Sequence, residues 1–257
     1  MFLPMLYAIS SSLKPLDELW IFPPRFFVSN PTFKNFTELF RIMANSDVPF
    51  SRYIFNTIFV ALSGTVGHLF IASLCAYALA KHPFPGAKII FNVITLALMF
   101  NATVLALPNF IIMTKLGWVD SYQALIIPAF AAPLGLYLMK QFIEQMIPDS
   151  LLESARIDSA GEFMIFFKIV MPMVKPAWLT LIIFSFQSLW AIGSNQLIFT
   201  EQYKTLNYAI TQILAGGVSR GGAAAAATVF MMAVPIIVFT VTQSNVVQTM
   251  STSGMKD

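Results

Sequence analysis

The chain consists of long apolar runs separated by short polar segments. Five runs have the length of a membrane span, and they cover residues 54–80, 89–113, 122–143, 174–192 and 223–242. An α-helix needs about 20 predominantly apolar residues to cross a hydrocarbon core of ~30 Å. The pattern therefore predicts five full transmembrane helices.

The first thirteen residues form a further apolar stretch. As a helix they would measure about 20 Å, which is shorter than the bilayer core. We expect either a chain that starts inside its first span or a half-length segment. A secretory signal peptide is disfavoured because no Lys or Arg precedes the apolar run and no small-residue cleavage site ends it.

The polar segments between the apolar runs are expected to form loops and turns. Residues 14–52 are expected to form a proline-containing surface loop with a short helix near residues 35–44. Residues 81–88, K-H-P-F-P-G-A-K, are expected to make a tight turn because two prolines and a glycine stop a helix there. Residues 193–222 are expected to form another loop, and a short polar tail follows the last span.

Prolines also lie inside the apolar runs. Pro108 falls within the second full span, and Pro128 and Pro133 are expected to kink the third. Taken together, the pattern predicts a single all-α, polytopic membrane domain over residues 1–257. We expect about six transmembrane helices, of which the first is truncated.

Composition supports a membrane protein. The chain has 57% hydrophobic and 11% charged residues, whereas roughly a quarter of the residues of a soluble domain are charged. The formal net charge of +3 gives no reason to expect nucleic acid as a partner. The lone Cys75 excludes an internal disulfide, and two histidines, His68 and His82, are too few for a metal cluster.

The segment 148–172 is a charged stretch that lies between two long apolar runs, residues 122–143 and 174–192. Its start fits a capping box, in which Ser150 or Asp149 caps a helix and Glu153 reaches back to an unpaired amide. A helix is therefore predicted from about residue 150 to about residue 160, with Gly161 ending it in the left-handed conformation. Because so short a helix is unstable alone in water, it needs the membrane or another protein to hold it.

The rest of the segment is apolar and leads into the next span. Residues 163–171 are interrupted only by Lys168, and Pro172 and Pro176 follow. This pattern predicts an interfacial connector, or lever, between the short helix and a transmembrane helix. Physical chemistry alone leaves a second interpretation open, in which an ordinary capped helix lies on the bilayer and Glu153 pairs with Arg156 three residues later.

The spacing within the segment resembles the signature of ABC importer permeases. That signature reads Glu-Ala-Ala, three residues, Gly, nine residues, Ile, one residue, Leu-Pro. The residues that match it in register are Glu153, Ala155, Ile169 and Pro172. Ser154, Ser159 and Met171 stand where the signature has Ala, Gly and Leu.

The flanking sequence is similar to that of carbohydrate importers of the maltose-transporter permease kind. The similar stretches are S-S-L-K-P near the start, R-Y-I-F-N-T at the first full span, A-R-I-D after Glu153, Thr205-Leu206 after the fifth span, and the tail 243–256. The family usually has a complete first span and an Asn and an acidic residue after the tryptophan that follows the fifth span. Here Trp190 is followed by Ala191 and Ile192.

The resemblance implies a cytoplasmic coupling helix that docks in a groove of an ATPase. Glu153 would be its charged contact, and Ala155 and Ser159 its close-packing positions. The full coupling set implied by the resemblance is Glu153, Ser154, Ala155, Arg156, Asp158, Ser159, Ala160 and Gly161. The sidedness rests on the resemblance, because Lys and Arg are divided almost evenly between the two sides.

The resemblance also implies partners. They are two ATPase subunits, which hold ATP and magnesium, a second homologous permease, an extracytoplasmic solute-binding protein and the lipid bilayer. No cofactor is expected on this chain itself. The implied location is the cytoplasmic membrane of a bacterium or archaeon, with several passes.

Polar residues within the apolar runs are candidates for a substrate pathway. His68 is the one ionisable residue deep in a span, which makes it a functional candidate. Asn101, Asn109, Gln187 and Asn195 are the others. The alternative for each is a packing or surface role, and for His68 that of a neutral, hydrogen-bonded core residue.

Several functions compete with transport. The chain has no G-x-x-x-x-G-K-[ST] motif, so it is not expected to hydrolyse ATP. Spans almost free of charged residues argue against a proton- or sodium-coupled carrier. A membrane enzyme would need a motif such as H-E-x-x-H or G-x-S-x-G, which the sequence lacks.

A purely structural subunit would leave the signature unexplained. The sequence therefore predicts the permease subunit of an ATP-driven importer, for a sugar or oligosaccharide, that works by alternating access. A permease for a non-sugar solute remains the main alternative.

Overall fold

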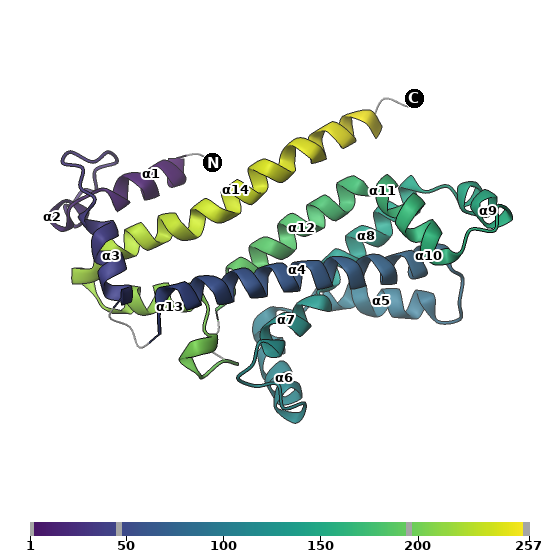
Figure 1. Cartoon of the computed structure of the whole chain (residues 1–257), viewed down its shortest axis with the longest axis horizontal. Helices are drawn as coiled ribbons and strands as arrows, with labels where there is room; N and C mark the ends of the chain where they lie inside the picture. Colours follow the sequence, from purple (N-terminus) through teal and green to yellow (C-terminus); the bar gives the residue numbers. More distant parts are fainter. Residues whose placement is uncertain (1–2, 45–47, 194–196, 254–257) are drawn as a thin grey trace. The chain divides into compact units, whose positions relative to one another are not determined.

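A computed structural model describes residues 3–44, 48–193 and 197–253 of the chain (Figure 1). The regular structure in these ranges is helical, and they contain no β-strand. The all-α prediction is therefore confirmed. The contacts divide the chain into two compact units: unit 1 comprises residues 1–59 and 190–238, and unit 2 comprises residues 60–189 and 239–257. The prediction of a single domain stays a prediction.

Unit 1 combines short helices from the start of the chain with helices from its last third. They are α1 (Leu3–Ser12), α2 (Leu16–Leu19), α3 (Lys34–Ala44), the first turns of α4 (Phe50–Lys81), α13 (Leu206–Ala215) and much of α14 (Gly221–Ser253). Leu39 and Met43, four residues apart on α3, are buried with Ile210 and Ile213 of α13. The spacing explains why α3 forms, since residues three or four apart share one helical face.

The predicted loop 193–222 is wrong in part, because it contains α13 and two short 3₁₀ turns. Leu206, Ile210 and Ile213 recur at helical spacing and are all buried. Glycines and polar residues around them conceal this short pattern in the sequence. Likewise, the predicted tail after residue 242 is wrong in part, because α14 continues to Ser253.

Unit 2 holds the rest of α4 and most of the middle of the chain. Its further helices are α5 (Ala87–Ala97), α6 (Ala102–Lys115), α7 (Gln123–Phe130), α8 (Pro133–Met146), α9 (Asp149–Ile157), α10 (Glu162–Ile165), α11 (Met171–Met173) and α12 (Lys175–Trp190). The core joins Ala76 of α4, Met139 and Ile143 of α8, Leu152 of α9 and Leu181 of α12. Helices distant in sequence thus meet around α9.

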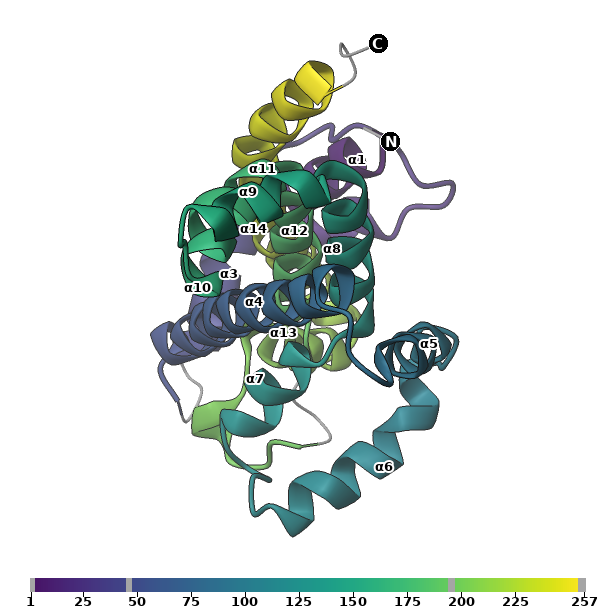
Figure 2. The same ribbon diagram turned by 90° about the vertical axis from the view of Figure 1, so that its right-hand side faces the viewer.

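Residues 89–113 were expected to be one span, and this prediction is wrong. The structure has two helices, α5 and α6, that run in different directions (Figure 2). The break lies at residues 98–101, where the Asn101 side chain accepts a hydrogen bond of 2.9 Å from the Thr103 amide and caps α6. Pro108 lies inside α6. An Asn cap therefore divides the run, and the proline does not.

Among the residues that the structure describes, three stretches are long and apolar enough to cross a membrane: α4, residues 123–146 and residues 218–242. The helices of residues 162–173 and 175–190 meet at a bend of 82°, and they add a fourth if they form one span. The helix over residues 123–146 is interrupted just before Pro133, as expected. Multiple apolar helices agree with the predicted polytopic membrane protein.

Candidate functional site

The site begins with α9, which lies between α8 and the predicted lever. Leu152 and Ala155, three residues apart, are buried in the unit 2 core beside Ile165 and Val170. Ile157 is 83% exposed. Because residues three or four apart share a helical face, α9 has one face in the core and another face in solvent.

The start of α9 differs from the predicted capping box. The helix begins at Asp149, Pro148 occupies the N-cap position, and no side chain caps the helix. Lys81, the last residue of α4, instead donates to the Ile147 carbonyl at 2.7 Å and pairs with Asp149 Oδ1 at 2.8 Å. A cation from a distant helix thus holds the entry to α9, which local sequence patterns do not reveal.

The end of α9 is also different from the prediction. Gly161 has an extended backbone, with φ of −68°, and Ser159 takes the left-handed conformation, with φ of 62°. The amide of Ala160 donates to the Ala155 carbonyl, and that of Ser159 to the Arg156 carbonyl, both at 3.0 Å. These two bonds define a Schellman motif, in which glycine is usual at the left-handed position.

Ser159 is the residue that stands where the ABC permease signature has Gly. The left-handed turn explains why a glycine suits this position, since a side chain there is strained by roughly 1–2 kcal/mol. The helix therefore ends at residue 157, three residues earlier than expected. The shorter helix keeps Ser159, Ala160 and Gly161 in the turn that follows it.

Glu162, the first residue of α10, joins three elements. Its Oε1 lies 2.8 Å from Arg156 Nε, and its Oε2 accepts a hydrogen bond of 2.8 Å from Tyr77 Oη. His82 Nε2 lies 3.3 Å from the same Oε2. The carboxylate therefore ties the last turn of α9 to the end of α4 and the turn after it.

The pKa shifts of Glu162 and Arg156 agree with this arrangement. The Arg156 hydrogen bond, followed by that of Tyr77, outweighs partial burial and holds the pKa of the Glu162 carboxyl below its usual value. The same bond raises the pKa of Arg156. The alternative in which Arg156 pairs with Glu153 is therefore wrong. Glu162 was missed at the sequence level, because its partners are up to 85 residues away.

The remaining predicted coupling residues lie on the solvent side of α9. Glu153, Ser154 and Asp158 are exposed, and Ser154 Oγ donates to the Ser150 carbonyl at 2.8 Å. Within the part of the chain that the structure describes, Glu153 has no hydrogen-bond or ion-pair partner. Its carboxylate, one turn from the exposed Ile157, is thus available to a partner protein.

The predicted lever is helical throughout. It consists of α10, a π-helical turn over Phe166–Val170 and α11, after which the 82° bend leads into α12. Ile165, Phe166 and Val170 are buried in the same cluster as Leu152. The Trp178 indole donates to the Met171 carbonyl across the bend at 3.0 Å. Packed side chains therefore connect α9 to α12 through the lever.

The predicted substrate-pathway residues are dispersed. His68 is 1% exposed, and its Nδ1 lies 3.2 Å from the Phe130 carbonyl oxygen. Asn101 caps α6, whereas Asn109 and Gln187 are exposed on α6 and α12. Asn195 lies outside the described residues. No hydrogen bond joins any two of the four that the structure describes, so the pathway stays a prediction.

Comparison with known proteins supports the sequence resemblance. The family model described as "Binding-protein-dependent transport system inner membrane component" matches residues 42–252. A relative of Bacillus subtilis, the arabinooligosaccharides transport system permease protein AraQ, is 29% identical over 257 residues, which cover 98% of this chain and 90% of that protein.

Other relatives match in part. The polygalacturonan/rhamnogalacturonan transport system permease protein YtcP of Bacillus subtilis is 31% identical and shares 77% of this chain and 66% of its own length. The sn-glycerol-3-phosphate transport system permease protein UgpE of Yersinia enterocolitica is 35% identical, over 58% of this chain and 55% of its own.

A solved structure shows the same fold. It is described as a bacterial ABC transporter involved in the import of the acidic polysaccharide alginate, and its matching chain superposes with a TM-score of 0.79 at 24% identity. The match covers 95% of this chain and 90% of the other.

Proposed function

Because this chain belongs to the family of binding-protein-dependent transport system inner membrane components, we propose that it is the permease subunit of an importer for a sugar or oligosaccharide. Membership makes the chain a multi-pass membrane transport subunit that works with an ATPase and a solute-binding protein. Its relatives are permease subunits and not enzymes. Their names include arabinooligosaccharides and polygalacturonan, and these names support a carbohydrate.

In this proposal α9 is the coupling helix. The observation that carries the proposal is the exposed Glu153, which has no hydrogen-bond or ion-pair partner among the described residues, on a helix whose opposite face is anchored by the buried Leu152 and Ala155. A helix that short is held in place by its packing, so it is able to present Glu153 and Ile157 to a groove of the ATPase. The proposed contact set comprises Glu153, Ser154, Arg156, Asp158, Ser159, Ala160 and Gly161. Ala155, also expected in this set, is buried in the unit 2 core and therefore packs α9 against its own chain.

The proposed mechanism is alternating access. Two ATPase subunits close on ATP and move α9 and its counterpart in a second, homologous permease. The lever of residues 162–173 and the bend transmit this movement to α12. The spans then expose a central path first to the solute-binding protein and then to the cytoplasm. The proposed location is the cytoplasmic membrane of a bacterium or archaeon.

Replacement of Glu153 tests the coupling role. The assembled transporter is reconstituted in liposomes, and ATP hydrolysis is measured with and without loaded solute-binding protein. Glu153→Ala should lower the stimulated rate by about tenfold or more and weaken co-purification of the ATPase, because a charge-assisted contact at an interface is lost. Asp17→Ala, which removes an exposed carboxylate from α2, is the control and should change neither quantity. Unchanged stimulation and assembly in Glu153→Ala would refute the role.

A further inference from the structure

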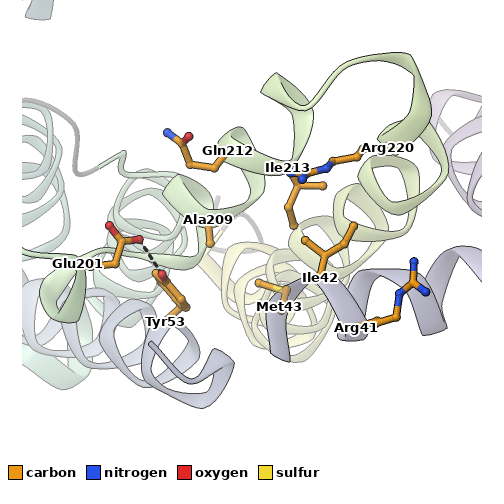
Figure 3. A pocket seen from close by; sticks show the side chains of 9 residues that line it. All are labelled: Arg41, Ile42, Met43, Tyr53, Glu201, Ala209, Gln212, Ile213 and Arg220. Carbon is orange, nitrogen blue, oxygen red and sulfur yellow. Dashed lines mark hydrogen bonds between the residues drawn. The ribbon is translucent and has the colours of Figure 1, made fainter. Parts of the chain in front are cut away.

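Unit 1 contains a pocket of about 510 Å³ that the coupling mechanism does not use. Its walls come from α3, the first turn of α4, the 3₁₀ turn Glu201–Tyr203, α13 and the segment before α14 (Figure 3). A volume of this size lies within the ~300–1,000 Å³ typical of small-molecule sites. Tyr53 belongs to the first turn of α4, so the pocket opens near the end of that helix remote from Lys81.

The floor of the pocket is apolar and well supported. Ile42, Met43, Ala209 and Ile213 line it, and Met43 and Ile213 also belong to the buried cluster of unit 1. Because these side chains are fixed by core packing, the floor is formed before a ligand arrives. Apolar surfaces of this kind suit the C–H faces of a sugar ring.

One wall carries a carboxylate whose charge is already balanced. Glu201 Oε1 accepts a hydrogen bond of 2.6 Å from Tyr53 Oη, and its Oε2 lies 2.8 Å from Lys204 Nζ. Partial burial raises the pKa of the Glu201 carboxyl, but the bonds from Lys204 and Tyr53 outweigh it and leave the pKa below its usual value. Glu201 is therefore an ionised and oriented acceptor.

The other wall carries two arginines, Arg41 and Arg220, which lie on the opposite side of the pocket from Tyr53 and Glu201 in Figure 3. Arg41 pairs with Glu38 at 3.5 Å, but the two side chains are 75% and 42% exposed, so the pair is weak. Within the described residues, the Arg220 guanidinium has no hydrogen-bond or ion-pair partner.

The Arg220 side chain is placed by the backbone before it. Gly217 takes a positive φ of 83°. A Cβ at Gly216 would lie only 2.3 Å from Arg220 Cδ. Because Gly216 has no side chain, the Arg220 side chain fits into the space beside it. The result is a pocket wall whose positive charge on Arg220 is not neutralised by any of the described residues.

We propose that this pocket binds a carbohydrate that bears an anionic group, either a carboxylate or a phosphate. Arg220 and Arg41 receive the anion, because a guanidinium matches the two oxygens of such a group. Glu201 accepts hydrogen bonds from hydroxyl groups, the Gln212 amide both accepts from and donates to them, and the apolar floor contacts the ring. The inference rests on the proposed function and specifies the class of its substrate.

Direct binding tests the proposal. Calorimetry on the assembled transporter in nanodiscs, without solute-binding protein, compares trigalacturonate, glucose 6-phosphate, maltotriose and inorganic phosphate. An anionic sugar should bind at least about tenfold more tightly than maltotriose, and higher salt should weaken this binding. Tight binding of trigalacturonate identifies a carboxylate ligand, and tight binding of glucose 6-phosphate identifies a phosphate ligand. Equal binding of maltotriose overturns the proposal, and so does inorganic phosphate binding as tightly as the anionic sugars.

Variants assign the binding to this pocket. Arg220→Gln should weaken binding of the anionic ligand at least about tenfold, and Arg220→Lys should retain only part of it, because an ammonium keeps the charge but not the match to two oxygens. Arg25→Gln, which removes an exposed arginine outside the pocket, should bind like the parent. Unchanged affinity in Arg220→Gln overturns the proposal. Binding of the anionic ligand is also measured in Glu153→Ala, which alters α9 and leaves the pocket intact, and it should match that of the parent. Failure of the pocket is therefore distinguishable from failure of the coupling proposal.

Discussion

Arg156 Nε lies 2.8 Å from Glu162 Oε1, and this ion pair closes the turn between α9 and α10. The partners are six residues apart, and Ser159 makes the left-handed turn that brings them together. Tyr77 and His82 reach the other carboxylate oxygen. Glu162 thus positions α9, the proposed coupling helix, against the end of α4, although it belongs to neither element.

Removal of the Glu162 charge should weaken this positioning. We expect Glu162→Gln to reduce ATPase stimulation several-fold with the complex still assembled, because α9 folds but is held less rigidly. The loss of unfolding free energy should be small, about 0.5 kcal/mol, since the pair is partly exposed. Asp158→Asn, an exposed acidic residue nearby, is the control for stability. Unaltered stimulation in Glu162→Gln would contradict the positioning role.

Acid should loosen the same turn. The pKa of Glu162 is lowered from 4.5, first by Arg156, so its stabilisation is present above that pH and is lost as the pH falls through the lowered pKa. The protection factors of residues 155–162 against hydrogen exchange should fall below about pH 4.5. Glu162→Gln should lack this transition. The same acid dependence in that variant would show that another group is responsible.

Ser159→Gly should stabilise the protein. Glycine removes the strain of a side chain in the left-handed region but gains more freedom on unfolding, so the net increase in unfolding free energy is about 0.5–1 kcal/mol. Thermal unfolding in detergent measures it. Gly161→Ser is the companion variant, and it should be nearly neutral because Gly161 has an extended backbone with open space beside it. Destabilisation by Ser159→Gly would disagree with the turn geometry.

The two faces of α9 should respond differently to truncation. Leu152 is 1% exposed, so Leu152→Ala should lower the unfolding free energy by about 2–4 kcal/mol through the cavity it leaves. Ile157 is 83% exposed, so Ile157→Ala should leave stability unchanged and weaken ATPase co-purification. If Ile157→Ala assembles normally, the docking face excludes that residue.

Gly135 should not tolerate a side chain. A Cβ there would lie 2.1 Å from His68 Nε2 and 2.4 Å from Leu181 Cδ1. Gly135→Ala should therefore destabilise unit 2 by about 1–3 kcal/mol through overpacking, as measured by thermal unfolding. Gly161→Ala, at a position with nothing within 4 Å, is the matched control. A neutral Gly135→Ala would mean that α4 and α8 are less closely packed than the structure shows.

The sequence alone determined the class of this protein and the place of its signature segment. Apolar runs of bilayer length are sufficient to predict membrane helices, because each helix satisfies its own backbone. The signature spacing located α9 and the family, both within residues 148–172. Local patterns also predicted α3 and the interruption before Pro133.

Only the tertiary structure decided how that segment is held. Lys81, Tyr77 and His82 come from α4 and the turn after it, and they bind Asp149, the chain before it and Glu162. The same applies to the pocket of unit 1, whose Tyr53 and Glu201 are 148 residues apart. A pattern of neighbours along the chain contains no information on such pairs, because hydrogen bonds and ion pairs depend on distances in space.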